Sequence, residues 1–235
     1  MHKISLLVTL LLIGCASKHP LPPPLLGNTQ LEEAEKARAD YAKEHTEFRC
    51  EKTAIPTKFV VFPFDQGKST TLMVSPSLRL RLKLGKFIDI PGTYTRRSES
   101  NYILSSASGN ELGLAESMMC KVDDGIGFGE IRVVLNPLEN SVIIEEATGG
   151  AGACTRHIVF VPKPGSNVRN GGRKEDWQTF HVSLPIRSVG PGYEGDSIGR
   201  VFGLSGRKIY LEMDGVFYAF PLEKVVTTEL GVSTG

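Results

Sequence analysis

LRLRLKL, residues 78–84, is the stretch of sequence that decides the fold class. Leucines and cations alternate along it, and successive side chains of a β-strand point to opposite faces of the sheet. The stretch therefore predicts a half-buried strand, with its leucines on the inner face and its cations on the outer face. The body of the chain is expected to be built from such strands.

Further strands are expected on both sides of this stretch. They fall at residues 59–64, 70–74, 102–104, 131–135, 142–146, 158–161 and 180–186, and turn residues separate them. The clearest pair is 208–212 and 216–220, because Asp214-Gly215 between them supplies the positive φ angles of a tight hairpin turn. Ten or so short strands without regular alternation with helices predict a mainly β fold, an antiparallel β-sandwich or barrel.

A helical pattern is found in residues 29–49. Thr29 and Glu32 fit a capping box, and a narrow apolar stripe follows along one face. The segment is expected to be one N-terminal helix, either a solvated stalk or a helix resting on the domain; a short coiled-coil seam or a partner-binding helix is the alternative. Residues 50–235 then form the β-rich domain, in which the glycine-rich loop at 162–176 either separates two lobes or is an insertion.

The first residues have the order of an export signal. His2 and Lys3 precede an almost unbroken apolar run at residues 4–13, and the small residue Gly14 stands before Cys15. The run is too short to span a membrane as a helix. Residues 1–14 are therefore expected to be a signal peptide.

The end of this leader, LIGC at residues 12–15, resembles the lipobox of bacterial lipoproteins. The resemblance covers the leader alone and implies cleavage before Cys15 and acylation of that cysteine. Lipoproteins of this class carry more than one acyl chain, which implies firm attachment to a membrane. An ordinary signal peptide and an uncleaved anchor helix are the alternatives.

The residues after the cysteine indicate where the body is held. Ala16, where some sorting signals have Asp, implies the outer membrane by resemblance to Gram-negative sorting patterns. Residues 15–28 are expected to be a proline-rich spacer, since four prolines favour polyproline II. At about 3.1 Å per residue the spacer would hold the body roughly 30 to 40 Å from the lipid, on the periplasmic face.

Four cysteines are present, and three remain if Cys15 is acylated. An oxidising periplasm allows one disulfide among Cys50, Cys120 and Cys154. Cys120 with Cys154 is preferred because the two flank the expected 131–146 hairpin, but all three pairings stay open. No CxxC spacing supports a zinc ribbon, and no metal or cofactor is expected.

Two sets of side chains suggest chemistry or binding. Cys154 with His157, together with His181 as a further candidate, offers a nucleophile and base or ligands for a soft metal. Residues three apart on a strand face opposite ways, however, which favours a disulfide for Cys154. The cations Arg79, Arg81 and Lys83 share one strand face, which either contacts anionic envelope polymers or keeps the strand soluble.

The charge composition bears on one class of function. Lys and Arg total 27 against 26 Asp and Glu, so the overall charge does not indicate a nucleic-acid binder. The sequence predicts a lipid-anchored, periplasm-facing, non-catalytic binding or assembly module of the bacterial cell envelope. Its expected partners are the membrane, through the lipid, and an envelope protein or polymer. An envelope enzyme that uses Cys154 and His157, or a polyanion binder, is the alternative.

Overall fold

The computed structural model describes residues 36, 39–40, 43, 45–63, 67–122, 129–148, 155–184, 200–213 and 215–230. The chain divides into two compact units, Met1–Asp40 and Tyr41–Gly235, and the described strands all belong to the second. These strands form three sheets, named A, B and C, in which every pairing is antiparallel. The mainly β, antiparallel fold predicted from the sequence is confirmed.

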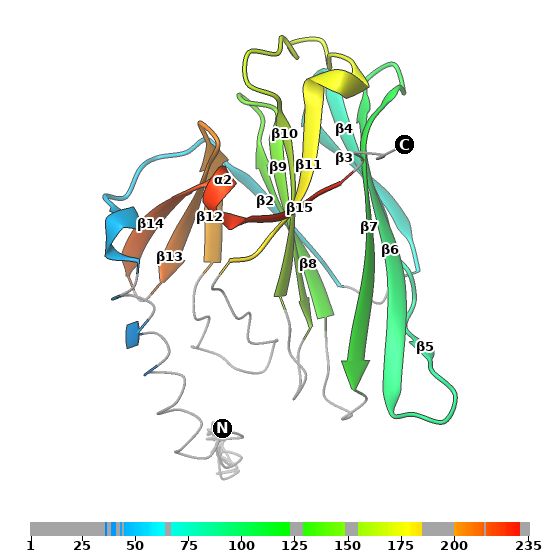
Figure 1. Ribbon diagram of the computed structural model, residues 1–235. Coiled ribbons are helices and arrows are strands. Elements are labelled where there is room, and N and C mark those ends of the chain that lie inside the picture. The colour runs from blue at the N-terminus through cyan, green and yellow to red at the C-terminus, as the bar shows by residue number, and fades with distance from the viewer. Residues whose placement is uncertain are drawn as a thin grey trace, which may run out of the picture. The chain divides into compact units, whose positions relative to one another are not determined.

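Figure 1 shows the three sheets side by side, with sheet B between sheets A and C. Sheet A has the order β1 (Arg49–Cys50), β14 (Val216–Pro221), β13 (Lys208–Met213) and β12 (Arg200–Ser205). Sheet B has the order β15 (Val226–Leu230), β11 (Trp177–Val182), β10 (Thr155–Pro162), β9 (Ser141–Thr148), β8 (Gly129–Asn136) and β2 (Lys58–Pro63).

Sheet C is organised around β6 (Thr95–Ser106), one of its two longest strands. One edge of β6 pairs with β7 (Glu111–Val122) along almost its whole length. The other edge pairs with β4 (Leu78–Lys83) and, further along, with β5 (Ile88–Asp89), and β3 (Ser69–Ser75) pairs with β4. Three short helical segments complete the described elements: η1 (Thr46–Phe48), η2 (Lys174–Asp176) and α2 (Leu222–Val225).

Sheet B is buried on both faces. Its strands contribute side chains to two separate hydrophobic cores, and adjacent residues of one strand enter different cores. Ile144 and Phe160 pack with leucines of sheet C, whereas Ile143 and Val159 pack with apolar side chains of sheet A. The body is therefore a stack of three layers with two cores, where the sequence predicted a sandwich or a barrel.

The sequence pattern of each strand reflects its layer. In the outer strand β4, Leu78, Leu80 and Leu82 are fully buried and the cation that follows each of them is exposed, as predicted. In the central strand β9, every residue from Ser141 to Ala147 is buried. A strand that is buried on both faces needs no alternation of apolar and polar residues, because the side chains on both faces are removed from water.

Strand β7 was not predicted, since its residues are poor strand formers. Gly113, Ala115 and Ser117 fall on its inner face, and Gly and Ala are depleted in strands. Their small size has a use here. A Cβ built on Gly113 would lie 2.9 Å from Thr179 Oγ1 and 3.0 Å from Phe160 Cδ1, so the glycine lets β7 approach sheet B closely.

The single N-terminal helix expected over 29–49 is not supported. Residues 36, 39, 40 and 43 are helical and the remainder of 29–44 lies outside the described residues, but Thr46–Phe48 is a 3-10 turn and Arg49–Cys50 is a strand. Phe48 packs on Phe220 with their ring centroids 4.8 Å apart. This contact and the pairing of β1 with β14 hold the segment on sheet A. A helix here could not form the backbone hydrogen bonds of that pairing. The α-helix with described bounds is α2, near the C-terminus.

The loop around 162–176 connects two strands of the same sheet. Pro162 of β10 pairs directly with Trp177 of β11, so the loop joins two neighbouring strands of sheet B. Trp177 Nε1 donates to Gly171 O at 2.8 Å and holds the loop against the strand end.

Polar contacts join sheets A and B at the turn between β12 and β13. Glu139, in the β8–β9 turn, accepts bonds from Ser205 Oγ at 2.5 Å and Gly206 N at 2.8 Å. Arg207 has a φ of 58° and its guanidinium donates to Glu223 Oε1 at 2.9 Å and to Gln178 Oε1 at 3.2 Å. These contacts fix the hairpin of sheet A over the ends of sheet B.

Among the described residues, no helix is both long and apolar enough to cross a membrane.

The three-layer arrangement predicts that adjacent residues of β9 are equally important. Ile143→Ala and Ile144→Ala should each lower the free energy of unfolding by about 2–5 kcal/mol, because each leaves a cavity in a different core. Urea unfolding of the purified chain measures both. As a control on an outer strand, Leu80→Ala should cost as much, whereas Arg81→Ala should stay within about 0.5 kcal/mol. A near-neutral result for either isoleucine would contradict burial on both faces.

Candidate functional site

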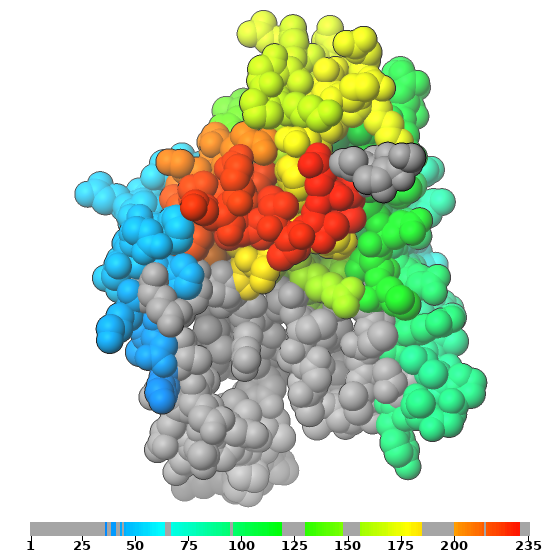
Figure 2. Space-filling model, in the orientation of Figure 1, coloured from blue at the N-terminus to red at the C-terminus, as the bar shows by residue number. Residues whose placement is uncertain are grey.

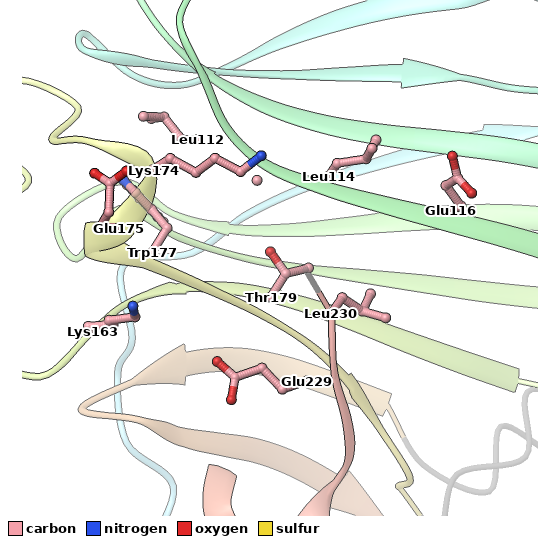
Figure 3. Close-up of a pocket in the computed structure, with 11 residues that line it drawn as sticks. Leu112, Leu114, Glu116, Lys163, Lys174, Glu175, Trp177, Thr179, Glu229 and Leu230 are labelled. Carbon is pink, nitrogen blue, oxygen red and sulfur yellow. The ribbon is translucent and has the colours of Figure 1, made fainter. Parts of the chain in front are cut away.

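A groove runs between the edge of sheet C and the edge of sheet B, and is called the β7 groove here (Figure 3). Its volume is about 500 Å³. It is lined by β7 on one side, by β11 and the preceding η2 segment, and by β15 on the other side; its residues are Leu112, Gly113, Leu114, Glu116, Lys163, Lys174, Glu175, Trp177, Thr179, Glu229 and Leu230. In Figure 2 the red atoms of α2 and β15 lie at the surface next to the green atoms of sheet C.

The apolar part of the lining of the β7 groove comes from Leu112, Leu114, Trp177 and Leu230. Leu112 and Trp177 are almost fully buried, and Leu230 packs against the core between sheets B and C. Leu114 is 36% exposed, so it offers open apolar surface. Because the indole N–H of Trp177 already donates to Gly171 O, the ring adds apolar surface without an unsatisfied donor.

Charged side chains line the β7 groove at both ends, and Glu229 of β15 adds a carboxylate between them (Figure 3). Figure 3 shows Lys163, Lys174 and Glu175 at one end and Glu116 at the other. Lys174 Nζ lies 3.4 Å from Glu111 Oε1. Within the described part of the chain, Glu116 and Lys163 form no ion pair, so both charges are available at the surface.

The edge of β7 beside the groove has no strand partner. β7 pairs with β6 on one edge, and none of the described strands pairs with the other. Arg156 of β10 reaches this edge, where its Nη1 donates to Met118 O at 2.5 Å. An unpaired strand edge presents backbone donors and acceptors that can bind another strand.

A buried carboxylate lies between sheets B and C. Glu146 of β9 is fully buried and accepts hydrogen bonds from Tyr102 Oη of β6 and, at 2.5 Å, from Ser117 Oγ of β7. Burial raises the pKa of Glu146, and the two hydroxyls and Arg156 offset part of that effect. The pKa of Tyr102 is also raised, first by burial and then by the charge of Glu146. Three strands from two sheets thus meet at one carboxyl group.

A second polar cluster lies on the opposite face of sheet B. Glu145 Oε2 lies 3.0 Å from His157 Nε2, and Glu145 Oε1 lies 3.9 Å from Arg132 Nη1. Burial lowers the pKa of Arg132, and the charge of Glu145 acts against this effect. The Arg132 guanidinium also lies over the Phe59 ring, with Cζ 4.5 Å from the centroid. The three groups form a row across β8, β9 and β10 in which each charge has a neighbour of opposite sign or a hydrogen bond.

Of the side chains suggested for catalysis, His157 and His181 line one hollow of about 340 Å³, which Arg156 also lines. Cys154 lies outside the described residues. His157 is 1% exposed and bonded to Glu145, on the face toward sheet A. His181 pairs with Ile158 and lies on the other face of sheet B; burial, followed by the charge of Arg156, lowers its pKa. The described part of the chain contains no group of three His, Cys, Asp or Glu side chains placed to hold a metal ion.

The cysteines are partly described. Cys50 in β1 has a free thiol, and burial raises its pKa although the charge of Lys208 opposes this. The structure therefore does not join Cys50 to either of the other candidates. Cys120 is a residue of β7 opposite Arg97 of β6, but its side chain, like Cys154, is outside the described part of the structure. The pairing of Cys120 with Cys154 stays a prediction.

The three cations of β4 share the outer face of sheet C, as the sequence predicted. Arg79 Nη1 donates to Ala107 O at 2.6 Å, so one of the cations is partly engaged. Across the sheet, the neighbours of Arg79, Arg81 and Lys83 on β6 are Ser105, Ile103 and Asn101, and the next residues on β7 are Glu111, Leu114 and Glu116. The column of cations thus lies about 10 Å from a column with two acids, which reduces its net field.

Comparisons with protein-family models, with curated proteins and with solved structures found no match.

Sequence reasoning missed the β7 groove because it missed β7. It also missed the two buried carboxylates, although a signal was present: Glu145 and Glu146 end the apolar run of β9. Adjacent carboxylates in a strand with no alternation indicate that each is buried on its own face and needs its own partners.

Replacing Glu146 should change how stability depends on pH. In the unfolded chain its carboxyl ionises near the ordinary pKa of 4.5, whereas the folded pKa is higher. As pH rises, the unfolded chain releases this proton at a lower pH than the folded chain does. The native chain therefore loses folding stability between the unfolded pKa and the higher folded pKa of Glu146. Glu146→Gln stays neutral, and its hydroxyl partners can still bond to it. The variant should therefore gain stability relative to the native chain as pH rises from about 4 to 7.

Urea unfolding of both chains across this pH range measures the difference. Glu116→Gln, on the exposed face of β7, is the matched control and should show no such pH-dependent gain. Parallel stability curves for the native chain and Glu146→Gln would contradict a raised pKa for Glu146.

Proposed function

We propose that this chain is a lipid-anchored binding or assembly module of a bacterial cell envelope, held on the periplasmic face of the outer membrane and without catalytic activity. The observation that carries the proposal is the end of the leader, Leu12 to Cys15, with the short apolar run before it and the proline-rich spacer after it. Acyl chains on Cys15 would supply the membrane attachment.

The organisation of the body supports a binding role. The histidine suggested for catalysis, His157, is used inside the fold, where it bonds to Glu145. Accessible features include a groove with a partly apolar lining and, beside it, an edge of β7 that no described strand pairs with. These features suit the binding of a partner better than the activation of a substrate.

The segment between the lipid and the body would act as a spacer. Residues 15–28 are rich in proline and favour an extended conformation. After the spacer, residues 36, 39, 40 and 43 are helical. The body would then be presented away from the bilayer to other components of the envelope.

Mass spectrometry of the chain expressed in a Gram-negative host tests the anchor. The mature protein should begin with an acylated Cys15 and be found in the membrane fraction. Cys15→Ser should lack the acyl mass and be lost from that fraction, because no acyl chain can be attached. Cys50→Ser is the control and should remain acylated. A mature N-terminus other than an acylated Cys15 would overturn the proposal.

The polyanion alternative retains one observation, the exposed row of Arg79, Arg81 and Lys83. If this row binds lipopolysaccharide, changing all three residues to Gln should remove salt-sensitive retention on immobilised lipopolysaccharide. The control changes three exposed lysines elsewhere, Lys58, Lys163 and Lys208, to Gln and should leave retention in place. Unchanged retention of the first variant would eliminate this alternative.

A further inference from the structure

The edge of β7 that faces away from β6 is regular over most of its length. Residues 113–118 pair with residues 104–99 of β6 without interruption, and the register shift falls at Leu112, between the Gly113–Leu104 and Glu111–Ser105 pairs. A regular strand has a fixed pattern of outward backbone groups, so the groups on the free edge can be assigned from one of them.

Met118 provides that assignment. Its carbonyl accepts a bond from Arg156, a residue of sheet B, and so points away from β6. In an antiparallel strand the N–H and C=O of one residue point to the same side, and the side alternates along the chain. Glu116 and Leu114 therefore also direct their N–H and C=O groups to the free edge.

This free edge borders the β7 groove. Leu112, Leu114 and Glu116 belong to both, and the groove continues to β11 and to Leu230 of β15. From Leu112 to Met118 the edge is about 20 Å long, which is the length of about seven extended residues. Outward backbone groups at alternate positions, next to apolar lining, match an extended chain with apolar side chains on one face.

We propose that the edge of β7 from Leu112 to Met118 binds an extended peptide segment of a partner protein, which adds to sheet C as a further strand. The segment has apolar side chains at alternate positions, a cation near Glu116 and a carboxylate near Lys163. This proposal rests on the binding function proposed above and specifies which side chains the bound segment of the partner carries. Arg156 limits the added strand by occupying the carbonyl of Met118.

The space beside β7 selects this occupant over a second copy of the chain. β15 and η2 line the groove opposite and beside β7, so the groove is enclosed on both sides. A single extended chain fits between such sides. The β7 strand of a second copy would bring its own β15 and η2 into the same space.

A labelled peptide tests the proposal with the full acylated chain in detergent micelles. The probe is Lys-Val-Thr-Val-Thr-Val-Glu, compared with its reversed sequence, and binding is measured by fluorescence anisotropy. Two further versions carry N-methyl groups on alternate amides in opposite frames. One frame should weaken binding about tenfold, because it blocks the amides that face β7, and the other frame should leave binding within about twofold. Failure of both sequences to bind, or equal effects of the two frames, would overturn the proposal.

Variants of the protein test the same edge from the other side. Leu114→Pro removes an outward N–H at a position where an edge strand tolerates proline, and should weaken binding about tenfold. Leu114→Val keeps that N–H and should bind within about twofold of the native chain. Circular dichroism checks that both variants are folded; if Leu114→Pro is not folded, the two methylation frames still decide the matter. A folded Leu114→Pro that binds normally would overturn the proposal.

Two outcomes separate this inference from the anchor and from self-association. An acylated chain that does not bind the peptide would remove strand addition and leave the lipid anchor in place. Self-association of the native chain that Leu114→Pro abolishes would assign the edge to a second copy and overturn the peptide proposal. Light scattering of the same micelle samples, compared with empty micelles, detects it.

Discussion

The fold depends on the burial of sheet B on both faces. An outer sheet of an antiparallel protein needs one apolar face, but a middle sheet needs two, so its strands must be apolar at successive positions. Strands β8, β9 and β10 meet this requirement, and each supplies side chains to both cores. Sheets A and C are then held to sheet B by separate cores and need no extensive contact with one another.

The polar groups inside this stack are placed where two or three strands can satisfy them. Glu146 receives hydroxyl groups from two strands of sheet C, and Glu145 has His157 and Arg132 on neighbouring strands of its own sheet. A buried carboxylate without such partners would be strongly destabilising. The chemistry that the sequence suggested around His157 is therefore better understood as part of the interior of the stack.

Sequence reasoning succeeded where one strand face is buried and failed where tertiary contacts decide. The alternation of β4 and the Asp-Gly hairpin of β13 and β14 are local patterns, and the structure contains both. β7 has no such pattern, since its inner face carries small residues whose value depends on the approach of Phe160 and Thr179. The third layer was missed for a related reason: a continuous apolar run indicates a buried strand but does not show what covers each face. The β7 groove could not be predicted because β7, which forms one of its sides, was not predicted.

The adjacent glutamates of β9 also have a consequence for how the chain avoids misfolding. A slip of β9 by one residue would exchange Glu145 and Glu146 between the two cores, and each carboxylate would then meet the wrong partners. Apolar side chains such as Ile143 and Ile144 are nearly interchangeable and would scarcely resist that slip. The two carboxylates make the correct alignment of the central strand distinguishable from its nearest competitor, at a position where hydrophobicity alone carries no such information.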